Sequence, residues 1–126
     1  MRSAIVTGGL GFIGSHLVEL LINKKFKVFI IDNEYSGKIN NVKRHKNITI
    51  IKKDIRKLNG YKFKNIDYIF HLAALADIVP SINNPYEYIS VNVEGTANML
   101  ELGRQLKIKK FIYAASASCY GYASIP

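Results

Sequence analysis

The sequence of 126 residues contains one cysteine and no apolar run of the roughly 18 residues that a membrane-spanning helix needs. The single Cys119 excludes an internal disulfide and a multi-cysteine metal site, and neither His16 nor His45 has partners spaced for a metal. Glycines interrupt the hydrophobic stretch near the N-terminus, so no secretory signal is predicted. We therefore expect a cytoplasmic protein that has neither a metal site nor a membrane segment.

Acidic residues are also few: nine Asp and Glu stand against 18 Lys and Arg, which gives a net charge of +9. Most of the basic residues lie between Lys24 and Lys64, where only Asp32, Glu34 and Asp54 oppose them. Such a cluster is typical of proteins that bind nucleic acid or phosphate-bearing ligands. Here the basic residues do not repeat on one helical face, and few aromatic residues lie among them for base stacking. We interpret the charge as a solvated surface and keep nucleic-acid binding as a third hypothesis, on charge alone.

The chain alternates between short β-branched segments and helical patterns. Strands are predicted at 2–7, 27–32, 47–53, 66–73 and 109–115, and helices at 11–24 and 83–107. In the first helix Phe12, Ile13, Leu17, Leu20 and Leu21 are near helical spacing; in the second, Asn84 is the predicted N-cap and Pro85 occupies the first turn. A loop or one short helix is expected between Lys53 and Asn65. This alternation predicts an α/β fold with a Rossmann-like, doubly wound parallel sheet of five strands in the order 3-2-1-4-5.

A glycine-rich segment, "TGGLGFIG", joins the first strand to the first helix. Gly9, Gly11 and Gly14 fit the pattern G-x-G-x-x-G, and Gly8, Gly11 and Gly14 fit G-x-x-G-x-x-G. In a dinucleotide site one glycine makes a sharp turn, another lets the pyrophosphate approach the backbone, and the last lets helix and strand pack closely. The helix N-terminus then offers free N–H groups to the phosphates. The strand before this loop and the helix after it supply the context that the pattern requires.

Asp32 ends the second strand, 18 residues after Gly14. A carboxylate at this place accepts hydrogen bonds from the ribose hydroxyls and repels a 2′-phosphate. Glu34 adds to that repulsion, and no Lys or Arg follows Asp32 before Lys38. The sequence therefore predicts NAD as the cofactor, although Lys38 keeps NADP open.

Four stretches together resemble a known family: "TGGLGFIGSHL", "DNEYSG", "HLAALADIVPSINNPYEYISVNVEGTANMLE" and "KKFIYAASASCYG". They are similar to the extended short-chain dehydrogenase/reductase family, in particular its NAD-dependent epimerase/dehydratase group, which acts on nucleotide sugars. Within that group "IVPSINNP" and "YAASASCYG" look most like UDP-glucose and UDP-N-acetylglucosamine 4-epimerases. The resemblance implies that residues 1–126 are an NAD-binding Rossmann domain, truncated before the last part of the sheet and the sugar-nucleotide domain.

The resemblance also implies a role for particular positions. Those implied to bind the cofactor are Gly8, Gly11, Phe12, Ile13 and Gly14 at the pyrophosphate, Asp32 and Asn33 at the ribose, Asp54 and Ile55 at the adenine, Leu72, Ala73 and Ala74 beyond the fourth strand, and Asn92 on the long helix. Ser116 matches the catalytic serine, and Ser118 would face a nucleotide-sugar substrate, most simply a UDP-sugar. We interpret His71 as a satisfied core histidine, Cys119 as a small hydrophobic residue near the site, and Gly95 as a point of close packing against the sheet.

In the family a 4-epimerase oxidises the C4 hydroxyl of the sugar with NAD and returns the hydride to the other face. The resemblance implies a tyrosine base with a lysine four residues later, but none of the eight tyrosines here has one. We therefore expect the 126 residues alone to be inactive. A 4,6-dehydratase or reductase of the same family and a non-catalytic NAD-sensing module remain alternatives.

The family usually forms a homodimer, with the long helix as one of the two helices at its interface. The second of these helices lies beyond the present sequence, so the resemblance implies a compromised dimer. Apolar side chains on the long helix should then stay uncovered: Ile89, Val93, Met99, Leu100 and Leu102.

Overall fold

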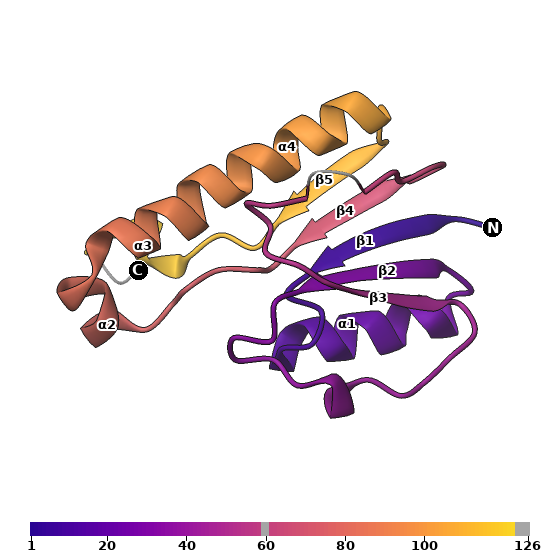
Figure 1. The fold of residues 1–126 in the computed structure, drawn as a ribbon, viewed down its shortest axis with the longest axis horizontal. Coiled ribbons are helices and arrows are strands. Elements are labelled where there is room, and N and C mark those ends of the chain that lie inside the picture. The colour runs from indigo at the N-terminus through magenta and orange to yellow at the C-terminus, as the bar shows by residue number, and fades with distance from the viewer. Residues whose placement is uncertain (59–60, 123–126) are drawn as a thin grey trace.

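The computed structural model describes residues 1–58 and 61–122 and is built on a sheet of five parallel strands in the order β3-β2-β1-β4-β5 (Figure 1). The strands are β1 (Ser3–Thr7), β2 (Lys27–Asp32), β3 (Ile48–Lys52), β4 (Tyr68–His71) and β5 (Lys110–Tyr113). All pairs of neighbours are parallel. The predicted Rossmann-like fold and strand order are therefore confirmed, and each strand lies within its predicted range.

The central strands are apolar between their ends on both faces of the sheet. Successive residues of a strand point to opposite faces, so Val6 packs with Val28 on one side and Ile5 packs with Ile31 on the other. All five residues of β1 are buried. Helices or loops must therefore cover both faces, which is the arrangement expected for a parallel sheet.

Helix α1 (Phe12–Asn23) lies within the predicted helix 11–24 and covers one face of the sheet. The buried residues are Gly14, Ser15, Val18 and Leu21. Of the residues noted for their helical spacing, Phe12, Ile13 and Leu20 are exposed, whereas Leu21 is buried. The helix is apolar around much of its circumference, and the small residues at 14 and 15 let its first turn approach the sheet closely.

The predicted long helix consists of three connected segments (Figure 1). These are α3 (Pro85–Ile89), a π-helical turn at Ser90–Glu94 and α4 (Gly95–Leu106). Asn84 is the N-cap, as predicted, because its Oδ1 accepts a hydrogen bond from the Glu87 N–H at 3.4 Å. The π-helical turn was not predicted, and neither was the short helix α2 (Ile78–Asn83) that precedes the cap.

The connections are mostly irregular, with short 3₁₀ turns at Ile39–Asn41 and Ala117–Tyr120. The described residues between Lys53 and Asn65 form no helix, while 59 and 60 lie outside the described part. In this connection Ile55 packs against Gly95, where an added Cβ would lie 2.5 Å from the Ile55 side chain. Gly95 therefore permits close packing, but against this loop and not against the sheet. Across the described residues, no helix is long and apolar enough to span a membrane.

Candidate functional site

A pocket lies at the carboxyl ends of the strands, where ligands bind in doubly wound sheets. It is lined from the ends of β1, β2, β3 and β4 and from helix α3. The predicted cofactor residues that line it are Gly8, Gly11, Asp32, Asn33, Asp54, Ile55, Leu72, Ala73 and Ala74. Residues that lie far apart in the sequence are thus brought together in one concave site.

The glycine loop has the tight geometry that a dinucleotide site requires. Gly8 has a φ of +67°, which favours glycine, and the Gly11 N–H donates to the Gly8 carbonyl at 3.1 Å. An added Cβ at Gly14 would lie 2.1 Å from the Gly8 carbonyl oxygen, so no side chain fits there. Gly11, the N-cap of α1, provides no side-chain cap for the helix N-terminus. The first N–H groups of α1, those of Phe12 and Ile13 among them, have no partner within the helix and are available to an anion.

Asp32 holds the glycine loop in place through a hydrogen bond to Leu10. Its carboxyl is buried, Oδ2 accepts from the Leu10 N–H at 3.0 Å, and Oδ1 accepts from the Glu34 N–H at 2.8 Å. Each oxygen keeps a second lone pair for another donor, such as a ribose hydroxyl. The next residue, Asn33, is exposed at the rim and accepts a hydrogen bond from the Tyr35 N–H. Asp32 thus joins the end of β2 to the glycine loop.

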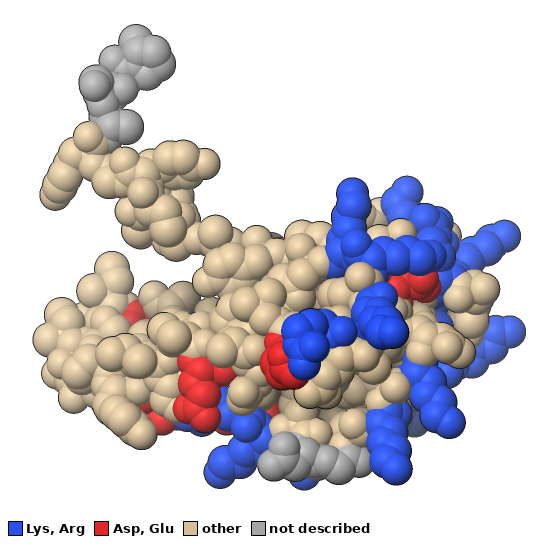
Figure 2. Space-filling model, turned by 90° about the horizontal axis from the view of Figure 1, so that it is seen from above, with Lys and Arg blue, Asp and Glu red and all other residues tan. Residues whose placement is uncertain are grey.

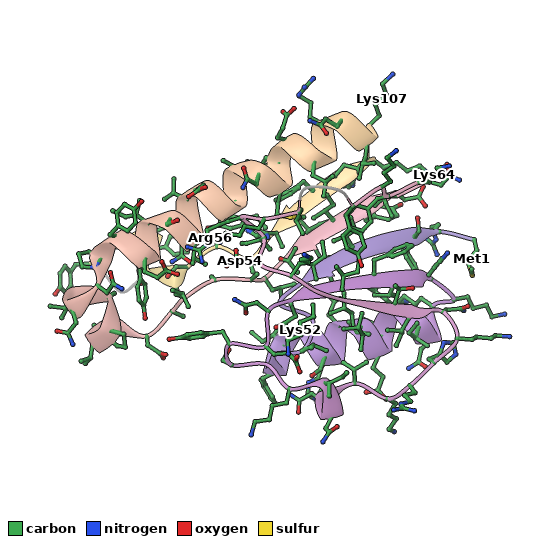
Figure 3. The ribbon with its side chains drawn as sticks, in the orientation of Figure 1. Met1, Lys52, Asp54, Arg56, Lys64 and Lys107 are labelled. Carbon is green, nitrogen blue, oxygen red and sulfur yellow. The ribbon has the colours of Figure 1, made fainter. Side chains whose placement is uncertain are left out.

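Asp54 is held by Arg56, an arginine for which the sequence analysis predicted no role. The guanidinium of Arg56 contacts both carboxylate oxygens, with Nη2 2.7 Å from Oδ2 and Nε 3.0 Å from Oδ1 (Figure 3). It also pairs with Glu87 at 3.0 Å and donates to Ser90 Oγ at 3.1 Å. This contact with Arg56 lowers the pKa of the Asp54 carboxyl. Arg56 therefore connects the loop after β3 to helix α3 at the edge of the pocket.

His71, at the end of β4, has hydrogen-bond partners for both ring nitrogens inside the protein, as predicted. It is 1% exposed, Nδ1 lies 2.7 Å from Thr7 Oγ1, and Nε2 lies 3.0 Å from Thr96 Oγ1. Burial lowers the pKa of the imidazole to about 4, so the ring is neutral at pH 7. It has the environment of a structural group and not that of a base.

Asn92 lies in the π-helical turn and contacts the backbone of the loop after β4. Its Oδ1 accepts from the Leu75 N–H at 2.8 Å, and its Nδ2 donates to the Leu75 carbonyl at 2.9 Å. Leu75 lines the pocket, whereas Asn92 is not among the lining residues. The cofactor role predicted for Asn92 remains a prediction, and the contact observed is with the wall of the pocket.

Residues 5–126 match the sequence pattern of the family described as GDP-mannose 4,6 dehydratase. The chain belongs to this family. The predicted resemblance to NAD-dependent epimerases is also confirmed by individual relatives. A UDP-N-acetylglucosamine 4-epimerase from Methanobrevibacter ruminantium, solved with UDP-N-acetylmuramic acid, is 41% identical, with a TM-score of 0.86 over 95% of this chain and 39% of its own.

Two further relatives differ from each other in the reaction that their names give. A UDP-glucose 4-epimerase from Thermus thermophilus, solved with NAD, is 32% identical with a TM-score of 0.80 over 91% of this chain and 38% of its own. A UDP-N-acetyl-alpha-D-glucosaminuronate decarboxylase from Bacillus cytotoxicus is 37% identical over 99% of this chain and 40% of its own. The chain therefore spans about two fifths of the length of these relatives.

Ser116 and Ser118, the two serines with predicted roles, lie after β5 in an exposed segment. The Ser118 N–H donates to Ser116 Oγ at 3.1 Å, which forms a local turn. Neither serine lines the pocket described above, so their roles stay predictions. Cys119 beside them is exposed, and its place near the site stays a prediction.

Two basic residues, Lys53 and Arg56, are among those that line the pocket. On the face shown in Figure 2, most Lys and Arg side chains lie over the end of the molecule at which the strands begin. Among the pocket residues Lys53 was overlooked, because only Lys38 was considered as a cation near Asp32. Strand β3 ends beside β2, and the Lys53 N–H donates to the Asp32 carbonyl, so the sheet brings Lys53 to the site.

The apolar surface predicted on the long helix is present only in part. Ile89, Val93 and Leu100 are exposed at 61%, 62% and 50%. Met99 is fully buried in the core, and Leu102 packs against that core, so the prediction was wrong for these two residues. Met99 faces the sheet because it lies on the side of α4 that carries Gly95 and Gly103.

Proposed function

We propose that this chain binds NAD in the pocket at the carboxyl ends of the strands. The observation that carries the proposal is the tight glycine loop at this pocket. Gly8 has a φ of +67°, Gly8 and Gly11 line the pocket where a pyrophosphate would approach, and Gly14 packs the first turn of α1 against the Gly8 carbonyl. The uncapped N-terminus of α1, with the N–H groups of Phe12 and Ile13, would bind the phosphates. Asp32, already oriented by the Leu10 and Glu34 N–H groups, would accept hydrogen bonds from the ribose hydroxyls.

The remaining lining residues would hold the other parts of the dinucleotide. Asn33 would contact the ribose, while Asp54 and Ile55 would contact the adenine. The loop of Leu72, Ala73 and Ala74 would lie against the cofactor beyond β4. Lys53 and Asp32 both line the site and have opposite effects on a 2′-phosphate. We expect Asp32 to dominate because its carboxyl is buried and oriented, whereas Lys53 is exposed.

We further propose that the chain is the N-terminal NAD-binding portion of a nucleotide-sugar 4-epimerase, acting through a 4-keto intermediate. Bound NAD would supply the hydride acceptor and donor. Ser116 would hydrogen-bond the reacting oxygen and Ser118 would face the sugar, most simply in a UDP-sugar. No Tyr-x-x-x-Lys pair is present in the 126 residues, so we expect them to be inactive on their own and the family's homodimer to be compromised.

A second candidate is a nucleotide-sugar decarboxylase or dehydratase of the same family. The 37% identical decarboxylase from Bacillus cytotoxicus favours keeping it, because it matches the chain over the same length as the epimerases do. Residues outside the present sequence would decide between these reactions. If the reading frame continues beyond Pro126, product analysis with UDP-glucose and with a UDP-uronic acid distinguishes an epimerase from a decarboxylase.

Calorimetric titration tests the cofactor directly. The 126-residue chain should bind NAD measurably and more tightly than NADP. Asp32→Asn keeps the shape of the side chain but removes its charge, and should weaken NAD binding at least tenfold, because hydrogen bonds to a charged group contribute about 1.5–3 kcal/mol. Asp77→Asn, at an exposed residue that does not line the pocket, is the matched control and should bind like the original chain. Preference for NADP, or equal effects of the two substitutions, would contradict the proposal.

Turnover tests the catalytic part of the proposal. The purified 126-residue chain, supplied with NAD and UDP-galactose or UDP-N-acetylglucosamine, should form no epimer. Epimer formation above the background of a chain-free sample would show that the catalytic base lies within these residues. It would remove the expectation that a Tyr-x-x-x-Lys pair is required.

A further inference from the structure

The hydroxyl of Thr7, at the end of β1, binds the beginning of the loop after β4. The N–H groups of Leu72 and Ala73 both donate to Thr7 Oγ1 at 3.1 Å, and the Leu72 N–H also approaches the Thr7 carbonyl at 3.2 Å. Two donors fill the two lone pairs of a hydroxyl oxygen. The proton of Thr7 must therefore point to another acceptor, which is Nδ1 of His71 at 2.7 Å.

Because the Thr7 hydroxyl donates to His71, the proton positions in the hydrogen bonds beyond His71 are also determined. Because Nδ1 of His71 accepts, the neutral ring carries its proton on Nε2, which donates to Thr96 Oγ1 at 3.0 Å. The Thr96 hydroxyl in turn donates to the Asn92 carbonyl at 2.6 Å. A second proton on the ring would face the Thr7 oxygen, whose lone pairs are already occupied. The geometry therefore permits a single arrangement of protons, with a neutral His71.

The far end of the same loop is held by the side chain of Asn92, which binds both the N–H and the carbonyl of Leu75. Residues 72–75 are thus held at their start by Thr7 and at their end by Asn92. Hydrogen bonds through His71 and Thr96 connect Thr7 to the backbone carbonyl of Asn92, the residue whose side chain is the second anchor. All four residues from 72 to 75 line the pocket, and an added Cβ at Gly8 would lie 2.9 Å from the Ala73 nitrogen.

We propose that His71, as the Nε2–H tautomer, is a positioning residue that couples the two anchors of residues 72–75 and so sets the wall of the pocket against the glycine loop. The consequence for ligand binding rests on the NAD site proposed above. The coupling itself does not rest on it, because it concerns only contacts within the protein. Thr96 is the connecting residue best suited to a test, since it touches His71 and Asn92 but does not line the pocket.

Nitrogen-15 NMR of the imidazole rings tests the proton arrangement without any substitution. The spectrum of His71 at pH 7 should have the ring-nitrogen shifts of a neutral ring with the proton on Nε2. A proton on Nδ1, or on both nitrogens, would overturn the proposal, because Thr7 then has no acceptor for its own proton.

Amide hydrogen exchange tests the coupling. Thr96→Val keeps the shape of the side chain but removes the hydroxyl, and should speed exchange at Leu75 and also at Ala73, on the far side of His71, by roughly 3- to 10-fold, the equivalent of one net hydrogen bond. Thr96→Ser keeps the hydroxyl and should restore slow exchange at both amides. Thr49→Val, on the exposed side of β3, is the matched control and should leave both rates unchanged. Faster exchange at Leu75 with no change at Ala73 would mean two independent anchors and would refute the coupling.

NAD titration of the same variants gives the functional readout. Thr96→Val should raise the dissociation constant by a similar factor, while Thr96→Ser and Thr49→Val should not. An unchanged dissociation constant for NAD in Thr96→Val would refute the positioning role of His71. If the original chain binds no NAD, the proposed cofactor site fails, yet the tautomer and the exchange rates still decide whether His71 couples the anchors.

Discussion

The burial of His71 predicts a loss of stability in mild acid. The pKa of its imidazole is about 4 in the folded chain, against an ordinary value of 6.5 that applies to the unfolded chain. Its neighbours are the hydroxyls of Thr7 and Thr96 and the rings of Phe111 and Tyr113, and burial alone lowers its pKa. Between pH 6.5 and pH 4 the unfolded chain binds a proton that the folded chain does not. The stabilisation is therefore complete above pH 6.5 and is lost as the pH falls toward 4.

The size of the effect follows from these two values. At pH 5 the unfolded imidazole is almost fully protonated, while only about a tenth of the folded molecules carry the proton. The free energy of unfolding should therefore be about 2 kcal/mol lower at pH 5 than at pH 8, from this residue alone. Urea unfolding followed by circular dichroism measures the difference at the two pH values.

Substitution of the histidine isolates its part of the pH dependence. His71→Gln should be less stable at pH 8, but its loss between pH 8 and pH 5 should be about 2 kcal/mol smaller than that of the original chain. His16→Gln, at an exposed residue, is the matched control and should keep the original pH dependence. Equal pH dependence in His71→Gln and the original chain would refute the reasoning, because the buried imidazole would then not resist protonation.

Three further predictions concern the glycine loop, the arginine and the exposed helix. Gly14→Ala should abolish detectable NAD binding in calorimetry, because its Cβ would lie 2.1 Å from the Gly8 carbonyl oxygen. Arg56→Ala should lower the free energy of unfolding in urea by about 1–3 kcal/mol, since it leaves Asp54 and Glu87 without their partner; Arg104→Ala, in an exposed ion pair, should change it little. The chain should self-associate in sedimentation experiments, and Val93→Lys should shift it toward the monomer, because Val93 is 62% exposed. A stable monomer of the original chain at high concentration would contradict the last prediction.

Much of the fold could be predicted because its signals are local. The apolar strands, the glycine loop and Asp32 each occupy a short stretch whose residue types permit few alternatives. The order of the strands followed from the handedness of the connections, which holds for parallel sheets in general. Asn84 could be recognised as a cap because a cap and its first turn are neighbours in sequence.

The contacts that shape the pocket could not be predicted in this way. Thr7 meets His71 across 64 residues, and Arg56 reaches Glu87 across 31, so spacing along the chain does not indicate either pair. The π-helical turn shifts the helix by a residue, and a periodic pattern averaged over the whole segment does not reveal it. Met99 illustrates the same limit: its apolar character predicted a helix face, but only the packing decided which face.

The separation between the basic end of the molecule and the pocket has a consequence for kinetics. On the face shown in Figure 2, most of the positive charge lies at the amino ends of the strands, so an anionic dinucleotide approaching that face would be attracted away from the glycine loop. At physiological ionic strength the Debye length is about 8 Å, which confines this attraction to the neighbourhood of the lysines. Encounters at the glycine loop should therefore gain little from long-range steering. The association rate constant for NAD should accordingly change little with salt, unlike that of a protein whose excess charge surrounds its ligand site.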